Sequence, residues 1–101
     1  YHRPGPVREL QAYWEPISTQ QNEYTVRWSL PEMPNGRLLH HIVECWDTQA
    51  SQDVCKNTVV KYPATEIRLK LKSSIIRFSV WAATSAGKSS SSVSFVASGE
   101  K

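Results

Sequence analysis

The stretch IIRFSVWAATSAGKS (residues 75–89) alternates apolar and polar side chains over most of its length. Side chains of an extended strand point in turn to opposite faces, so an alternating stretch of this kind has one apolar face. Four residues form that apolar face: Ile76, Phe78, Val80 and Ala82. We therefore expect a half-buried β-strand here, followed by a turn at Gly87, because glycine adopts the backbone angles of tight turns at little cost.

The end of this stretch, Gly87-Lys88-Ser89, also has the spelling of the end of a phosphate-binding loop. Such a loop has another glycine five residues before the Gly-Lys pair, where this chain has Ala82. It is followed by a helix whose N-terminus holds the phosphate, whereas serines fill residues 89–92 here. We therefore interpret Gly87 as a turn residue and expect no nucleotide site.

The rest of the chain repeats the alternation between turn signals. Seven segments are expected to be strands: residues 7–14, 24–30, 38–46, 54–60, 65–72, 75–83 and 91–97. Turn-forming residues separate them at intervals of roughly ten residues, which is typical of antiparallel sandwiches. The sequence thus predicts an all-β, seven-stranded, immunoglobulin-like antiparallel sandwich. Five residues represent its predicted core: Trp28, Val43, Leu69, Phe78 and Val80.

The chain has 101 residues, of which 40% are hydrophobic and 21% are charged, as expected for one globular domain. Its net charge of +3 is too small and too scattered to indicate nucleic-acid binding. No apolar run is long enough to span a membrane, so we expect membrane attachment only through a longer parent chain. The expected organisation is a linker at residues 1–6, one domain at 7–97 and a second linker at 98–101.

Three short motifs, in this order along the chain, resemble those of fibronectin type III domains. They are Trp28 with Pro31 and the turn Asn35-Gly36, then His41-Ile-Val43-Glu-Cys45, then the run from Ile76 to Gly87. The chain departs from the family pattern at three positions that the family fills with tyrosine: His41, Cys45 and Ile76. The resemblance implies that the sixth-strand tyrosine's hydrogen bond to a neighbouring loop is absent here.

This resemblance implies a non-enzymatic, extracellular module of a cell-surface receptor or adhesion protein, without cofactor or metal. Its partners would be a protein ligand or neighbouring extracellular domains. Two alternatives stay open: a purely structural spacer, which would also suit an intracellular protein, and a carbohydrate-binding accessory domain. The residues themselves contain no nucleophile elbow and no paired-carboxylate pattern, so they do not favour an enzyme.

The chain has two cysteines, Cys45 and Cys55. If the chain reverses near Ala50, the two residues lie directly opposite each other on adjacent strands, close enough for a disulfide. Paired cysteines in a small extracellular module usually form a disulfide, so we expect a bond, with two buried reduced thiols as the alternative. A zinc site is not expected, because His40 and His41 are adjacent on a strand and point to opposite faces.

Two sheet faces are candidates for binding, besides the loops at residues 31–37, 47–53 and 84–89. Four residues of the third and sixth strands are expected to point outward together: Ile42, Trp46, Arg77 and Trp81. Tryptophan and arginine are enriched at interface hot spots, which favours a protein-binding patch, with a self-contained cation–π cluster as the alternative. A basic set is expected on the outer face of the other sheet: Arg27, Arg68, Lys70 and Lys72. It is a candidate for heparan sulfate, or else a solvated strand face.

Overall fold

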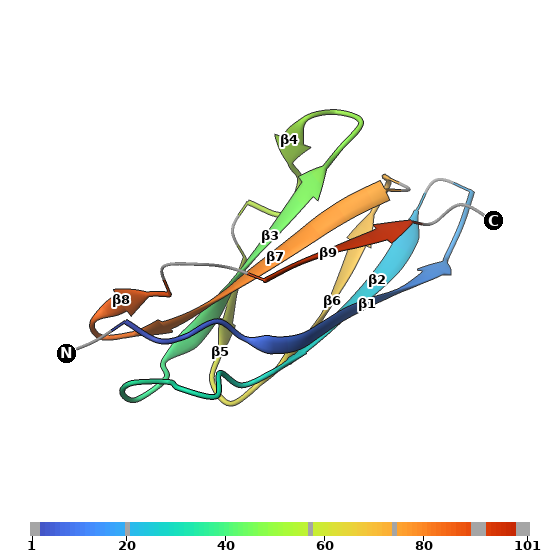
Figure 1. Cartoon of the computed structure of the whole chain (residues 1–101). Coiled ribbons are helices and arrows are strands. Elements are labelled where there is room, and N and C mark those ends of the chain that lie inside the picture. The colour runs from blue at the N-terminus through green and yellow to red at the C-terminus, as the bar shows by residue number, and fades with distance from the viewer. Residues whose placement is uncertain (1–2, 20, 57, 74, 90–92, 99–101) are drawn as a thin grey trace.

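The structure, a computed structural model, describes residues 3–19, 21–56, 58–73, 75–89 and 93–98 (Figure 1). Its strand segments are β1 (Arg8–Pro16), β2 (Asn22–Ser29), β3 (His40–Asp47), β4 (Gln52–Asp53), β5 (Thr58–Lys61), β6 (Glu66–Leu71), β7 (Ile75–Thr84), β8 (Gly87–Lys88) and β9 (Val93–Ser98). None of the described residues is helical, so no helix in this part of the chain could cross a membrane.

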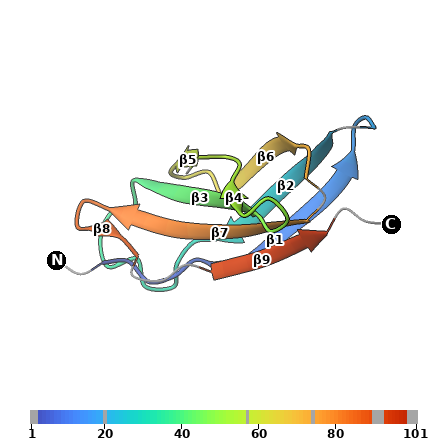
Figure 2. The ribbon, with the colours of Figure 1, turned by 90° about the horizontal axis from the view of Figure 1, so that it is seen from above.

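The strands form two antiparallel sheets that lie face to face, as the views from the side and from above show (Figures 1 and 2). One sheet has the order β1-β2-β6. In the other, β3 and β7 are central, β4 and β5 both pair with β3, and β8 and β9 both pair with β7. The short strands β4 and β5 together occupy one strand position beside β3, and β8 and β9 together occupy one beside β7. The predicted seven-stranded antiparallel sandwich is therefore confirmed.

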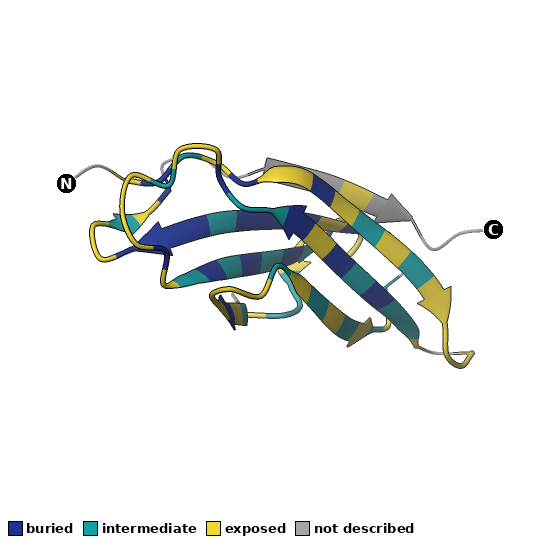
Figure 3. Cartoon of the chain, turned by 90° about the horizontal axis from the view of Figure 1, so that it is seen from below, coloured by how far each residue is buried: buried dark blue, intermediate teal, exposed yellow. Residues whose placement is uncertain are grey.

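The core lies between the two sheets, and buried residues alternate with exposed ones along the strands (Figure 3). Of the predicted core residues, four are almost completely buried: Trp28, Val43, Phe78 and Val80. Leu69 on β6 is partly buried and packs against this cluster. Alternation within residues 91–97 predicts that Val93 and Phe95 point inward, but their side chains lie outside the described residues. The backbone of β9 pairs with β7.

The predicted strand 54–60 is confirmed at residues 58–60 and wrong at residues 54–56, where the chain leaves the ladder. On this edge of β3 the described segments that pair are β4 and β5, and residues 54–56 lie between them. The Asp53 carboxylate accepts the backbone N–H groups of Cys55 and Lys56, each at 3.1 Å. Lys56 has a φ of 53°. These bonds satisfy the backbone locally and turn it away from β3, so alternation alone over-extended the strand.

The turn residues behave as the sequence predicts. Asn35 and Gly36 have φ values of 54° and 149° in the loop that leads from β2 in one sheet to β3 in the other. Gly87 has a φ of 121° and pairs with Thr84 where β7 turns into β8. The Ala86 N–H donates to the Thr84 hydroxyl at 3.2 Å and closes this turn. Gly87 is therefore a turn residue between two strands.

The position of the missing sixth-strand tyrosine is filled by Ile76, which is completely buried. The loop between β6 and β7 is instead fastened by another tyrosine, Tyr24, which lies earlier in the chain. The Tyr24 hydroxyl on β2 donates to the Ser73 carbonyl at 2.6 Å, and the Ser73 hydroxyl donates to the Asp47 carboxylate at the end of β3. This loop is thus anchored to both sheets without Ile76.

The segment before β1 packs on the loop between β2 and β3. Pro4 is buried, and the Gly5 N–H donates to the Met33 carbonyl at 2.8 Å. The Asn35 side-chain amide donates to the Arg3 carbonyl at 3.1 Å. These contacts lie within the predicted N-terminal linker, and β9 continues through Ser98 into the predicted C-terminal one. The domain boundaries themselves stay predictions.

Candidate interaction surface

The four residues expected to form the outward patch lie together on β3 and β7. In the antiparallel ladder Ile42 is directly opposite Trp81, and Trp46 is directly opposite Arg77. Arg77 is exposed and the other three side chains are half-buried. The two rows are four residues apart along each strand, which is roughly 13 Å. The four residues therefore share one face of the β3–β7 ladder, as period-two alternation predicts, and binding of a partner there stays a prediction.

A cationic side chain lies over the ring of each of the two tryptophans in this patch, Trp46 and Trp81. The Arg77 guanidinium carbon lies 6.0 Å from the centroid of the Trp46 ring. The Lys88 ammonium lies 4.9 Å from the Trp81 ring. The self-contained cluster considered from the sequence, with Arg77 serving both rings, is therefore two separate pairs. Sequence reasoning missed Lys88, although its position follows from the turn that pairs Ala83 with Lys88.

Two exposed valines extend the rows at their ends. Val59 on β5 pairs with Ile42, and Val96 on β9 pairs with Arg77. Each valine is 56% exposed. Alternation with Phe95 inward assigns Val96 to the outer face, but it could not assign Val59, because Val59 is followed by Val60 and either of the two could face the core. We call the six residues of these two rows the outer patch: Ile42, Trp46, Val59, Arg77, Trp81 and Val96.

Charged side chains border the outer patch. Glu44 lies between its two rows, opposite Ser79. Lys61 pairs with His40 at one end of β3. Lys88 pairs with Ala83 on β7, which is itself opposite His40. The exposed cations Lys61, Arg77 and Lys88 outnumber the two carboxylates nearby, Glu44 between the rows and Asp53 opposite Trp46. The patch thus consists of two largely apolar rows with charged side chains between and around them, and a polar rim is common at protein interfaces.

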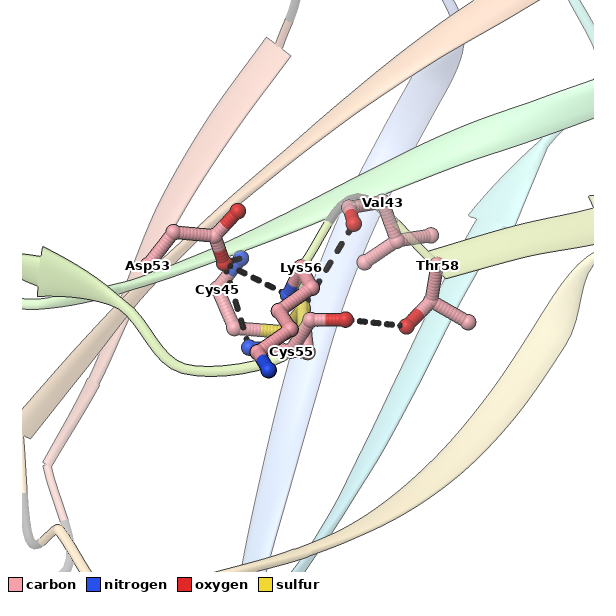
Figure 4. Close-up of a disulfide and its surroundings, with 6 residues drawn as sticks. All are labelled: Val43, Cys45, Asp53, Cys55, Lys56 and Thr58. Carbon is pink, nitrogen blue, oxygen red and sulfur yellow. Dashed lines mark hydrogen bonds between the residues drawn. A yellow bond between two sulfur atoms is a disulfide. The ribbon is translucent and has the colours of Figure 1, made fainter.

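The disulfide between Cys45 and Cys55 ties β3 to the segment between β4 and β5 (Figure 4). Its Cα atoms are 5.4 Å apart, within the usual range. The expected direct opposition of the two cysteines is wrong, because Trp46 pairs with Asp53 and the Val54 N–H donates to the Cys45 carbonyl. The irregular backbone after Asp53 brings Cys55 close to Cys45. The Thr58 hydroxyl donates to the Cys55 carbonyl at 2.8 Å.

Comparison with solved structures supplies a fold relative. The FN5 domain of Drosophila Lar superposes on this chain with a TM-score of 0.63 at 15% sequence identity. The superposition covers 96% of this chain and 99% of that domain. The sheet order of this chain and the nearly complete coverage of both chains support the same fold. The chain has the fibronectin type III fold. No family model and no curated protein sequence matches the chain.

On the opposite sheet of this fibronectin type III sandwich, the predicted basic set is interleaved with carboxylates. Arg27 is paired with Glu66 across the ladder, with 2.9 Å between Nε and Oε1. Lys70 lies opposite Glu23, which is itself opposite Glu15 on β1. Arg68 lies opposite Thr25, while Lys72 follows the end of β6. Binding of heparan sulfate by this set stays a prediction, on a face of nearly balanced charge.

The fibronectin type III fold places no obvious reaction centre among the described residues. There, no three His, Cys, Asp or Glu side chains gather where they could hold a metal ion. The hollows at the sheet ends measure about 320 to 440 Å³. One of them, about 350 Å³, lies between the β2–β3 loop and Tyr62, lined by Pro31, Pro34 and Arg37. That this domain has no enzymatic activity stays a prediction from its sequence.

Proposed function

We propose that this chain is a non-enzymatic recognition module of a cell-surface receptor or adhesion protein, and that it binds a protein through the outer patch. The observation that carries this proposal is the pair of tryptophan rows, Trp46 with Arg77 and Ile42 with Trp81, on one continuous sheet face. Tryptophan and arginine supply much of the energy at protein interfaces. The exposed valines that flank both rows add apolar area that a partner would bury.

An extracellular location is part of this proposal. The disulfide between Cys45 and Cys55 supports it, because such bonds persist mainly in oxidising compartments. The fold relative, an FN5 domain of Drosophila Lar, is compatible with the same setting. A purely structural spacer would have the same fold without using the outer patch, so binding at that face is what separates the two functions.

The test is a screen of the oxidised chain, as a labelled tetramer, against a panel of purified cell-surface ectodomains. The variants Trp81→Ala and Val59→Glu both alter the row of the outer patch that contains Ile42. We expect at least tenfold weaker binding from each, because removing one hot-spot contact costs about 1.4 kcal/mol or more. Val59 is exposed, so its replacement leaves the core unchanged.

The matched control is Tyr13→Ala, which removes a 52% exposed aromatic side chain from the outer face of the other sheet. Its affinity should equal that of the unmodified chain. Binding that survives both patch variants and is lost with Tyr13→Ala would place recognition on the β1-β2-β6 sheet instead. A folded, oxidised chain that binds no ectodomain in the panel would favour the spacer.

A further inference from the structure

The loop between β2 and β3 contains the dipeptide Asn35-Gly36 with an exposed, left-handed backbone. Both residues are exposed, and Asn35 is in the left-handed region with a φ of 54°. Gly36 has no side chain to shield its backbone nitrogen, and within the described residues that nitrogen has no hydrogen-bond partner. A free backbone nitrogen next to an asparagine amide is the arrangement from which a cyclic imide forms.

We propose that Asn35 is a site of spontaneous deamidation in the folded chain. The Gly36 backbone nitrogen attacks the Asn35 Cγ, a C–N bond forms and the Cγ–Nδ2 bond breaks. The amide nitrogen leaves as ammonia and takes with it the proton that Gly36 loses. Water then opens the five-membered imide, at the side-chain carbonyl to give aspartate or at the main-chain carbonyl to give isoaspartate. The sum is water in and ammonia out, without oxidation or reduction.

Asn22 provides an internal comparison, because it is an asparagine held in a regular strand. It is half-buried in β2 and paired with Pro16 on one side and Leu71 on the other. The next residue, Glu23, has a side chain that crowds the approach of its own nitrogen. The extended ladder also fixes the backbone, so that it cannot turn into a ring. Asn22 should therefore stay intact while Asn35 reacts.

The reaction would change how the start of the chain is held. The Asn35 amide donates to the Arg3 carbonyl at 3.1 Å, and this donor is lost when the amide becomes a carboxylate. The new carboxylate oxygen then faces the carbonyl oxygen of Arg3, and two acceptors repel each other. Isoaspartate also adds a methylene to the backbone two residues after Met33, whose carbonyl accepts the Gly5 N–H. Deamidation therefore releases the segment before β1 from the β2–β3 loop.

The same change adds a second carboxylate, besides that of Glu32, to the wall of a hollow of about 320 Å³. Asn35 lines this hollow together with Gly5, Pro6 and Met33. Arg8, at the start of β1, lines it too and donates from Nε to the Leu30 carbonyl at 3.0 Å. A carboxylate there attracts the Arg8 guanidinium and alters the surface between the N-terminal segment and the loop. Because deamidation accumulates with time, this end of the sandwich would change as the protein ages.

The test is to incubate the folded, oxidised chain in mildly alkaline buffer and to follow each asparagine by peptide mapping. Conversion is read as the amide-to-acid mass change, and isoaspartate is read by labelling with isoaspartyl methyltransferase. Asn35 is expected to convert to a mixture of both products while Asn22 stays unchanged. Equal or slower conversion at Asn35 than at Asn22 would overturn the proposal.

The release of the N-terminal segment is tested by hydrogen exchange on the aged chain and on Asn35→Asp. The Gly5 amide should exchange at least tenfold faster in both, while amides of β3 and β7 keep their rates. Asn35→Gln is the matched control, because it keeps an amide donor but does not readily form the five-membered imide. An unchanged Gly5 rate in the aged chain would show that deamidation leaves the segment in place.

Discussion

At the scale of single residues, the most unusual group is His41. Its ring has no exposed surface and lies 5.3 Å, centroid to centroid, from the Trp28 ring. Within the described residues neither ring nitrogen has a hydrogen-bond partner. Burial, with a smaller contribution from neighbouring His40, lowers the pKa of His41 from 6.5 to about 4. The ladder neighbours of His41, Ala82 on β7 and Val60 on β5, have no charge that would offset this.

The first prediction is that acid destabilises the sandwich through His41. The folded pKa lies below the unfolded one, so the unfolded state takes up more protons as the pH falls. Stability is therefore complete above about pH 6.5 and is lost progressively down to about pH 4. The full loss is about 3 kcal/mol, from 1.36 kcal/mol for each pKa unit. Urea unfolding at a series of pH values measures it.

The variants His41→Leu and His40→Gln make this result specific. His41→Leu fills a similar volume without a titrating group, so its stability should be nearly flat between pH 6.5 and 4. His40→Gln removes the more exposed histidine and should keep most of the fall. If His41→Leu retained the same pH dependence, the acid sensitivity would have to come from other groups.

At the scale of elements, β3 is the strand on which the structure depends most. It pairs with β7 along its whole length, and the short strands β4 and β5 share its other edge. Residues 54–56 are not in register pairs with β3, so that edge is held there by the disulfide, by the Val54 N–H bond to the Cys45 carbonyl and by Asp53. The outer patch shares this edge through Val59 and Ile42.

The second prediction concerns removal of this link. Cys45→Ala with Cys55→Ala should lower the free energy of unfolding by about 3 kcal/mol, the chain-entropy value for a loop of ten residues. Urea unfolding of the double variant against the oxidised chain measures the change. Hydrogen exchange should increase first in β4 and β5, and little in β1 and β2. A stability change near zero would mean that the β-ladders alone hold this edge.

At the scale of the whole molecule, one end of the sandwich is closed by a polar link between the layers. Tyr24 is completely buried in the first sheet, and its hydroxyl reaches the loop that leads into the second. Burial raises the pKa of the Tyr24 hydroxyl, which keeps it protonated and able to donate. The Ser73 hydroxyl, together with the backbone N–H groups of Ala50 and Gln49, lowers the pKa of Asp47 and keeps it an acceptor.

The third prediction is that Tyr24→Phe destabilises the chain by about 1 kcal/mol, since it removes one buried hydrogen bond and leaves the Ser73 carbonyl without that donor. The ring contact with Phe78, at 5.4 Å between centroids, stays. Thermal or urea unfolding measures the change. Tyr13→Phe is the control. Its exposed hydroxyl donates to the nearby Gln11 side chain, so its loss should lower stability by under about 0.5 kcal/mol.

The sequence by itself determined the sheet class, most strand positions, the turn glycines and the faces of β3 and β7. The physical reason is that period-two alternation assigns each side chain to the core or the surface, whatever the strand pairs with. Trp28, Phe78 and the outward pair Trp46 and Arg77 were assigned in this way. The disulfide partners also followed, because a hairpin brings nearby residues together even when its register is irregular.

Only the tertiary structure decided contacts between residues that are far apart in sequence. Tyr24 takes the place of the missing sixth-strand tyrosine, because its bond to Ser73 depends on where a distant segment lies. Glu66 and Glu23 balance the basic set for the same reason, since cross-strand register sets charge neighbours. The Asp53 turn that interrupts the fourth strand is local, but period-two alternation does not reveal such a turn. Alternation tells a side chain which way to face. Which partner it meets there is decided by the packing of the two sheets.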